Sequence, residues 1–118
     1  MEMSVSPIDA KHFSATTGDD PEFAAELLAV FIEDTEARLE EIQQSLQAGD
    51  LSQVKRTAHH LRGSSANVGC FAMQAIARDM ELNDHTVGEL QAMSAHLQEI
   101  LGQVKEFAHS LTATNSSG

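Results

Sequence analysis

Tryptophan and tyrosine are absent from this 118-residue chain, and its only prolines are Pro7 and Pro21. No segment alternates β-branched and polar residues between turn signals, so the sequence lacks the pattern of a β-sheet. The single cysteine, Cys70, excludes an internal disulfide and suits a reducing compartment. No apolar run approaches the ~20 residues of a membrane span, and the N-terminus lacks the charged and apolar regions of a signal sequence. We therefore expect a soluble helical protein of the cytoplasm.

Basic residues are scarce as well. The chain has 7 Lys and Arg residues against 18 Asp and Glu residues, which gives a formal net charge of −11. An acidic surface repels phosphate backbones, so we expect no nucleic-acid partner. Three of the 7 basic residues nevertheless lie close together, at Lys55, Arg56 and Arg62. The local charge of this segment opposes the global charge and marks the segment as a candidate site.

Apolar residues recur at three- and four-residue spacings through most of the chain, which predicts amphipathic helices. One such stripe comprises Phe23, Leu27, Val30, Phe31, Leu39, Ile42 and Leu46. Capping residues indicate the helix boundaries, because Asp and Thr side chains favour helix starts and glycine favours helix ends. We expect a short helix over about 8–15, a helix from Pro21 to near Gly49, a helix from Asp50 to Gly69, a helix over 70–82, and a last helix from Thr86, which pairs with Glu89 in a capping box, to Leu111.

Four long helices joined by short turns favour an all-α fold, an antiparallel four-helix bundle with a short extra N-terminal helix. The length suits one domain with a real core. We expect this bundle over residues 8–111, after an N-terminal tail over 1–7. Residues 112–118 are small and polar, which predicts a flexible C-terminal tail.

The third predicted helix carries the segment Ala58-His59-His60-Leu61-Arg62-Gly63. A helix turns ~100° per residue, so residues three, four and seven positions from His59 share its face. This face, here called the histidine strip, comprises Ser52, Lys55, Arg56, His59, Arg62, Gly63 and Ala66. The apolar residues of the same helix point mostly to the opposite side, as a buried face must. We therefore predict an exposed imidazole among cations, to which a partner brings a phosphoryl group.

Gly63 has two possible explanations. A glycine inside a helix costs about 1 kcal/mol relative to alanine, so its presence needs a reason. Tight helix packing is one, but Gly63 lies on the polar side, which favours access for an outside partner. His60 lies about 100° around the helix from His59 and therefore flanks the strip. The plain alternative for the whole strip is a solvated helix face that carries ordinary charges.

Other chemistries have weaker support. Cys70 opens a predicted helix, where the helix dipole can lower a thiol pKa, but a lone cysteine at such a position is more often a small packed side chain. The two adjacent histidines lack the three- or four-residue spacing of a helical metal pair. No glycine-rich phosphate loop is present, so the sequence indicates no ATP site.

The segment from Ala58 to Gly69 resembles the signature of histidine-containing phosphotransfer (HPt) domains. That signature runs Ala-His-x-Leu-Lys-Gly, then small residues, then a glycine that closes the helix. The resemblance extends to the acidic region 31–34, the turn 48–50 and the helical layout, and spans about residues 8–110. It implies that His59 is the phosphorylated histidine. Arg62, in place of the usual lysine, would help to neutralise the phosphoryl group, and Gly63 would clear space for the partner. The helical spacing itself places Lys55 one turn before His59, as a second cation for the phosphoryl group.

The resemblance also implies a role in a phosphorelay. His59 would accept a phosphoryl group from a receiver-domain phospho-aspartate and pass it to another receiver aspartate. The partners would be response-regulator receiver domains and a hybrid sensor kinase, and the receiver would supply the acidic pocket and Mg²⁺. The chain itself would be a monomeric phosphocarrier with no cofactor and no kinase activity of its own. Ser52, Arg56 and Ala66 would border the docking surface, which would include exposed parts of the second helix.

A helical-bundle adaptor is the alternative from another functional class. Such a protein would bind a signalling partner without phosphoryl transfer. The intact histidine, basic residue and glycine argue against it, because an adaptor has no need for His59.

Overall fold

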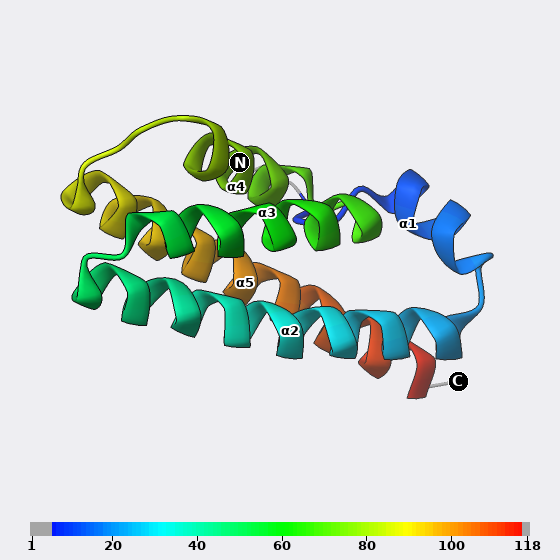
Figure 1. The fold of residues 1–118 in the computed structure, drawn as a ribbon. Helices are drawn as coiled ribbons and strands as arrows, with labels where there is room; N and C mark the ends of the chain where they lie inside the picture. Colours follow the sequence, from blue (N-terminus) through cyan, green and yellow to red (C-terminus); the bar gives the residue numbers. More distant parts are fainter. Residues whose placement is uncertain (1–5, 117–118) are drawn as a thin grey trace, which may run out of the picture.

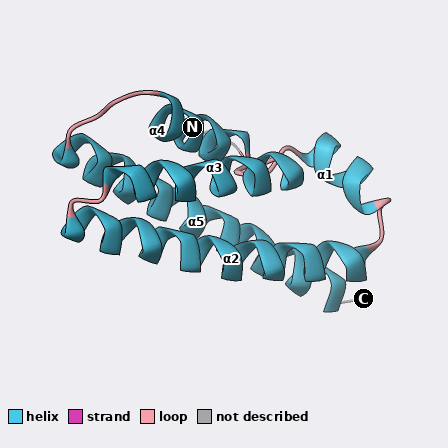
Figure 2. Ribbon diagram, in the orientation of Figure 1, coloured by secondary structure: helices cyan, strands magenta, loops and turns pink. Residues whose placement is uncertain are grey.

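The computed structural model of the chain describes residues 6–116, with side chains to Leu111. Five helices make up this part of the chain, and no strand occurs within it (Figure 2). The helices are α1 (Ala10–Thr17), α2 (Pro21–Ala48), α3 (Leu51–Val68), α4 (Phe71–Leu82) and α5 (Val87–Ser116). The expected all-α class is confirmed.

The four long helices form an antiparallel bundle, and α1 lies at one end of it, next to the end of α3 (Figure 1). Turns of two residues join α2 to α3 and α3 to α4, so each pair runs in opposite directions. α2 packs against both α3 and α5, and α3 packs against α4. The predicted four-helix bundle with a short extra N-terminal helix is therefore confirmed.

Side-chain caps begin α2, α3 and α5 where the sequence predicts them. Asp20 accepts hydrogen bonds from the backbone N–H groups of Glu22 and Phe23 at the start of α2. Asp50 accepts one from Gln53 at the start of α3. Before α5, Thr86 and Glu89 satisfy each other's backbone N–H groups at 2.8 and 3.1 Å, the reciprocal pattern of a capping box.

The structure shifts three predicted boundaries. The first helix begins at Ala10 instead of Ile8, because Asp9 caps it and Ile8 is buried in the core before the cap. It continues to Thr17, where Gly18 ends it. Cys70 is the N-cap of α4 and not a residue of its first turn.

The structure tests the two predicted tails only in part. α5 extends past Leu111 to Ser116, so part of the predicted tail has a helical backbone. Residues 1–5 and 117–118 lie outside the described residues. The flexibility of 112–118 stays a prediction.

α1 completes the end of α3. The carbonyl of Gly69 accepts a hydrogen bond from the Asp9 N–H at 2.9 Å, and the Asn67 carbonyl lies 3.1 Å from Nε2 of His12. Gly69 has φ +79°, and a Cβ there would lie 3.1 Å from the His12 ring. A helix end leaves carbonyl groups without intrahelical partners. α1 therefore supplies donors to carbonyls at the end of the histidine helix.

The buried core fixes the rotation of α3. Its buried apolar side chains are Val54, Ala58, Leu61 and Val68, as the helical periodicity predicts. The opposite face, with His59 and Gly63, is exposed. Two residues of the predicted α2 stripe differ from expectation, because Phe23 and Val30 are exposed and not part of the core. None of the helices within residues 6–116 is long and apolar enough to cross a membrane.

Leu61→Ala should lower the free energy of unfolding by about 2–5 kcal/mol, because it removes a fully buried side chain from the helix that carries His59. Leu82→Ala is the matched control, because that leucine is 54% exposed and its loss should cost about 0.5 kcal/mol or less. Urea unfolding followed by circular dichroism measures both. Equal losses for the two variants would contradict the observed orientation of the core.

Candidate functional site

His59 lies near the middle of α3 on its solvent side, with 59% of its side chain exposed. Ala58 and Leu61, its neighbours on the other side of the helix, are fully buried and hold the helix in place. Ser64 and Ser65 donate their hydroxyl hydrogens to the Leu61 carbonyl, so both hydroxyls are engaged with the backbone. The imidazole is therefore exposed on a rigid helix, as the sequence predicts.

A carboxylate from α4 meets this imidazole. Oε2 of Glu81 lies 2.6 Å from Nδ1 of His59, and the Glu81 side chain is only 18% exposed. Oε1 of the same carboxylate lies 3.1 Å from Nη1 of Arg62. One carboxylate thus joins the histidine to the arginine that follows it by one helical turn. Sequence reasoning missed Glu81, because it lies 22 residues after His59 on another helix.

The Glu81 contact selects one tautomer of His59. A carboxylate only accepts hydrogen bonds, so the neutral imidazole must carry its hydrogen on Nδ1. Nε2 then has a free lone pair, and it has no hydrogen-bond partner within residues 6–111. Nε2 is thus the unpaired nitrogen of an exposed ring, and its position is that of a nucleophile.

The predicted locally basic surface needs a correction. Arg62 is paired with Glu81, and Nζ of Lys55 lies 2.7 Å from Oδ1 of Asp84. The Lys55 ammonium lowers the pKa of the Asp84 carboxyl. Of the three cations on the histidine strip, only Arg56 pairs with no carboxylate among the described residues. Two of the three cations are therefore neutralised by acidic groups of α4 and the loop after it, which the sequence of α3 does not reveal.

A hollow of about 350 Å³ lies beside His59 and is lined by Lys55, Arg56, His59, His60 and Glu81. Arg56 is held at its edge by hydrogen bonds to Gln53 at 2.9 and 3.1 Å, and it lies 3.4 Å from Ser52 Oγ. The His60 ring is exposed and meets His59 edge to face, 5.9 Å between ring centres. His60 therefore flanks the site, as its position on the helix predicts, and shares none of the Glu81 contact.

Gly63 faces open space. A Cβ built at this position meets no atom within 4 Å, so the glycine is not required for helix packing. Beyond it, a groove of about 200 Å³ separates α2 from α3 and is lined by Leu27, Val30, Phe31, Asp34, Ser64, Asn67 and Val68. Ala66 is half-buried on the same helix, whereas Ser52 at the other end of the strip is exposed. An apolar groove thus adjoins the histidine strip.

Two other candidate sites carry no reactive group. Cys70 is fully buried, and burial raises the pKa of its thiol, which identifies it as a packed side chain and not an activated nucleophile. Within residues 6–111, no three His, Cys, Asp or Glu side chains are arranged to hold a metal ion.

Comparison with known proteins agrees with this geometry. The Hpt domain family matches residues 26–107. The phosphorelay intermediate protein rdeA of Dictyostelium discoideum is 31% identical over 90 residues, which cover 74% of this chain and 34% of that protein. The chain thus matches only about a third of the length of this relative.

Two solved structures share the fold. Histidine-containing phosphotransfer protein B from Pseudomonas aeruginosa PAO1 has a TM-score of 0.69 and 24% identity, covering 91% of this chain and 95% of that one. The HPT domain of a hybrid sensor histidine kinase from Shewanella has a TM-score of 0.68 and 18% identity, covering 98% of each chain. With the family match over most of the bundle, these findings establish that the chain belongs to the Hpt domain family.

Proposed function

We propose that the chain is a phosphorelay intermediate that carries a phosphoryl group on Nε2 of His59. The Nε2 lone pair attacks the phosphorus of a receiver-domain aspartyl phosphate, the acyl P–O bond breaks, and the aspartate leaves as a carboxylate. The reverse chemistry passes the phosphoryl group to an aspartate of another receiver. The observation that carries this proposal is the Glu81 contact to Nδ1, which leaves Nε2 free on an exposed face.

Glu81 and Arg62 assist the imidazole in this proposal. Positive charge develops on the ring as Nε2 attacks, and the Glu81 carboxylate at Nδ1 stabilises that charge. Arg62 keeps one nitrogen on Glu81 and has further N–H donors for the phosphoryl oxygens. Lys55 is a second cation at the hollow beside His59. The aspartate and the Mg²⁺ belong to the receiver, and this chain needs no cofactor of its own.

Receiver domains would dock on the histidine strip and the adjoining apolar groove. Gly63 leaves room for the close approach, and Val30 of α2, which is 66% exposed, lines the adjoining groove. Ser52, Arg56 and Ala66 border this surface on α3. The names of the relatives support the same partners, because one is a phosphorelay intermediate and another belongs to a hybrid kinase. A non-catalytic adaptor has no need for an imidazole held in one tautomer.

The test of the proposal is phosphorylation by a panel of phosphorylated receiver domains, followed by peptide mapping of the acid-labile phosphate. His59→Gln should remain folded and accept no phosphoryl group, because the exposed ring contributes nothing to the core. His60→Gln is the matched control and should still accept it. Phosphate mapped to His60 in the wild type would refute the assignment.

Glu81→Ala should remove the preference of the His59 ring for a single tautomer. In the wild type at a pH where the ring is neutral, ¹⁵N NMR should show hydrogen on Nδ1, since the carboxylate accepts from that atom at 2.6 Å. In the variant, the mixture of tautomers of free imidazole should return. His60, which has no carboxylate partner among the described residues, is the internal reference. A His59 spectrum unchanged by the substitution would disprove the role of Glu81.

Gly63→Ala should raise the free energy of unfolding by up to about 1 kcal/mol, since the site is open and alanine favours helix. Gly63→Gln should also fold, yet both should slow transfer from a receiver, glutamine more than alanine. A displacement of about 1 Å between reacting groups can cost ~100-fold in rate.

Gly102→Gln is the control for this pair, because Gly102 lies in α5 and is equally open. It should fold and transfer at the wild-type rate. Unfolding of Gly63→Gln, measured by calorimetry, would mean that Gly63 is a packing residue.

A further inference from the structure

His85 occupies the short connection between α4 and α5, with 19% of its side chain exposed. Its Nε2 lies 3.1 Å from Oδ1 of Asp79, in the last turns of α4. Its Nδ1 lies 3.5 Å from Oε1 of Glu89, in the first turn of α5. Each ring nitrogen thus faces a carboxylate oxygen. The Asp79 contact has hydrogen-bond length and the Glu89 contact is an ion-pair distance, so both carboxylates favour the imidazolium form, which has a hydrogen on each nitrogen.

Other polar groups lie at this corner, by which we mean the connection 83–86 and the helix ends that it joins. They add to the contacts of the His85 ring. Asp79 Oδ1 also accepts a hydrogen bond from Nδ2 of Asn83 at 2.7 Å. The remaining charged groups near the ring are Asp84, beside it in the loop, and Lys55 of α3, which pairs with Asp84 and lines the same small hollow as His85. Three carboxylates and one ammonium group therefore surround the imidazole, and their balance favours a positive ring.

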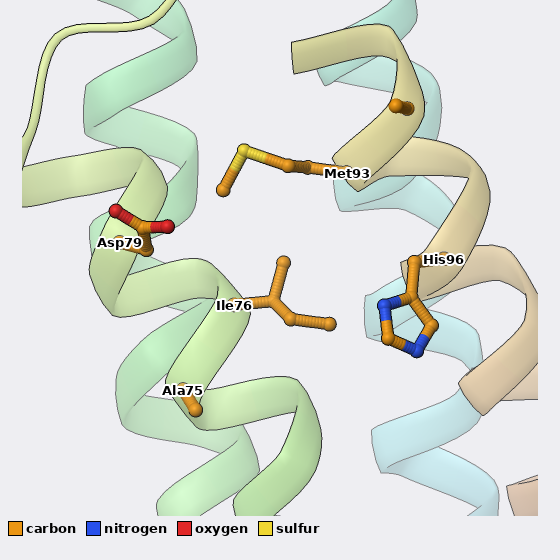
Figure 3. Close-up of a pocket in the computed structure, with 6 residues that line it drawn as sticks. Ala75, Ile76, Asp79, Met93 and His96 are labelled. Atoms are coloured by element: carbon orange, nitrogen blue, oxygen red, sulfur yellow. The ribbon is translucent and has the colours of Figure 1, made fainter. Parts of the chain in front are cut away.

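The corner matters because α4 and α5 leave a groove of about 400 Å³ between them. In Figure 3, Ile76 of α4 and Met93 of α5 extend into the space between the helices, and Asp79 and His96 lie at its edges. Apolar side chains therefore fill only part of the groove on this side of the helix pair. The His85 bridge is a polar connection across it, at the end where the two helices join.

The same turn of α4 carries the residue that contacts the histidine strip. Glu81 follows Asp79 by two positions, and its carboxylate holds both His59 and Arg62. Any shift of the end of α4 therefore moves this carboxylate relative to the imidazole of α3.

We propose that His85 is a proton-dependent positioning residue: as an imidazolium it ties the end of α4 to the start of α5 and so keeps Glu81 against His59. The inference rests on the proposed phosphoryl transfer at His59 and adds a pH response to it. His85 touches neither the phosphoryl group nor its partner, and acts only through Asp79 and Glu81.

The direction of the response follows from the charges. The hydrogen bond to Asp79 raises the pKa of His85 above its ordinary value of 6.5. The bridge is thus complete below pH 6.5 and is lost as the pH rises through the raised pKa. The pKa values of Asp79 and Glu89 are lowered from 3.8 and 4.5, so those carboxylates lose their part only in more acidic solution. The bridge is therefore strongest in mildly acidic to neutral solution.

The first experiment follows the histidine rings of the unphosphorylated protein by NMR as the pH rises from about 5 to about 9. We expect His85 to titrate above 6.5. Among His59 rings that are already neutral, the share with hydrogen on Nδ1 should fall as His85 loses its proton. His96 is an exposed histidine across the groove, and its titration is the reference for a ring outside the corner. Titration of His85 at or below 6.5 would overturn the inference, whatever the outcome for phosphoryl transfer.

The second experiment compares the pH profiles of transfer from a phosphorylated receiver domain. His85→Arg keeps a positive charge at every pH tested, so its rate should lack the alkaline decline of the wild type. His85→Gln lacks the charge and should be slow throughout. We expect differences of about two- to five-fold, the effect of an exposed ion pair. His96→Gln should follow the wild type.

Coincident profiles for the wild type, His85→Arg and His85→Gln would overturn the positioning role while leaving His59 as the phosphorylated residue. Absence of phosphohistidine in every variant would instead refute the proposed function. If His85→Gln does not fold, the comparison of the wild type with His85→Arg still decides the question. Identical alkaline declines in those two proteins would overturn the inference.

Discussion

Burial of one face of α3 is the constraint on which the site depends. Leu61 and Val54 are fully buried against the rest of the bundle, so the helix cannot rotate about its axis without exposing them. Because the helical repeat is 3.6 residues, this burial determines which residues face solvent. His59 and Gly63 face outward as a direct consequence. The precision of the site thus comes from apolar packing behind it, and the polar groups refine an orientation that the core has already set.

Glu81 shows how a second helix completes what one helix begins. A largely buried carboxylate needs partners, because an unpaired charge away from water is costly. His59 lies within hydrogen-bond distance of one carboxylate oxygen and Arg62 within ion-pair distance of the other, so the three groups hold each other in place. The packing of α4 on α3 therefore does more than close the core. It determines which nitrogen of the imidazole faces solvent.

Local patterns predicted most of the fold. The capping residues Asp20, Asp50 and Thr86 act over three positions in sequence, and their hydrogen bonds form as expected. The helical repeat alone placed His59 on an exposed face. Interactions between helices could not be predicted in this way. Glu81 looks like any other glutamate in the sequence, because only the crossing of α3 and α4 brings it to His59.

Two residues of the α2 stripe were predicted wrongly for a related reason. Its periodicity is helical throughout, but Val30 and Phe23 lie beyond the width that the neighbouring helices cover. Periodicity indicates an apolar face and does not indicate how much of that face is buried. The groove between α2 and α3 is therefore a feature of the assembled bundle, and the sequence of neither helix predicts it.

The small helix α1 has a consequence for where this domain begins. The family match starts at residue 26, inside α2, and so omits α1 entirely. Yet the N–H of Asp9 and the ring of His12 meet the carbonyls of Gly69 and Asn67 at the end of α3. A polypeptide cut at the start of the match would leave those carbonyls to water and uncover Gly69. The contacts that complete the end of the histidine helix thus extend beyond the residues that the family model matches.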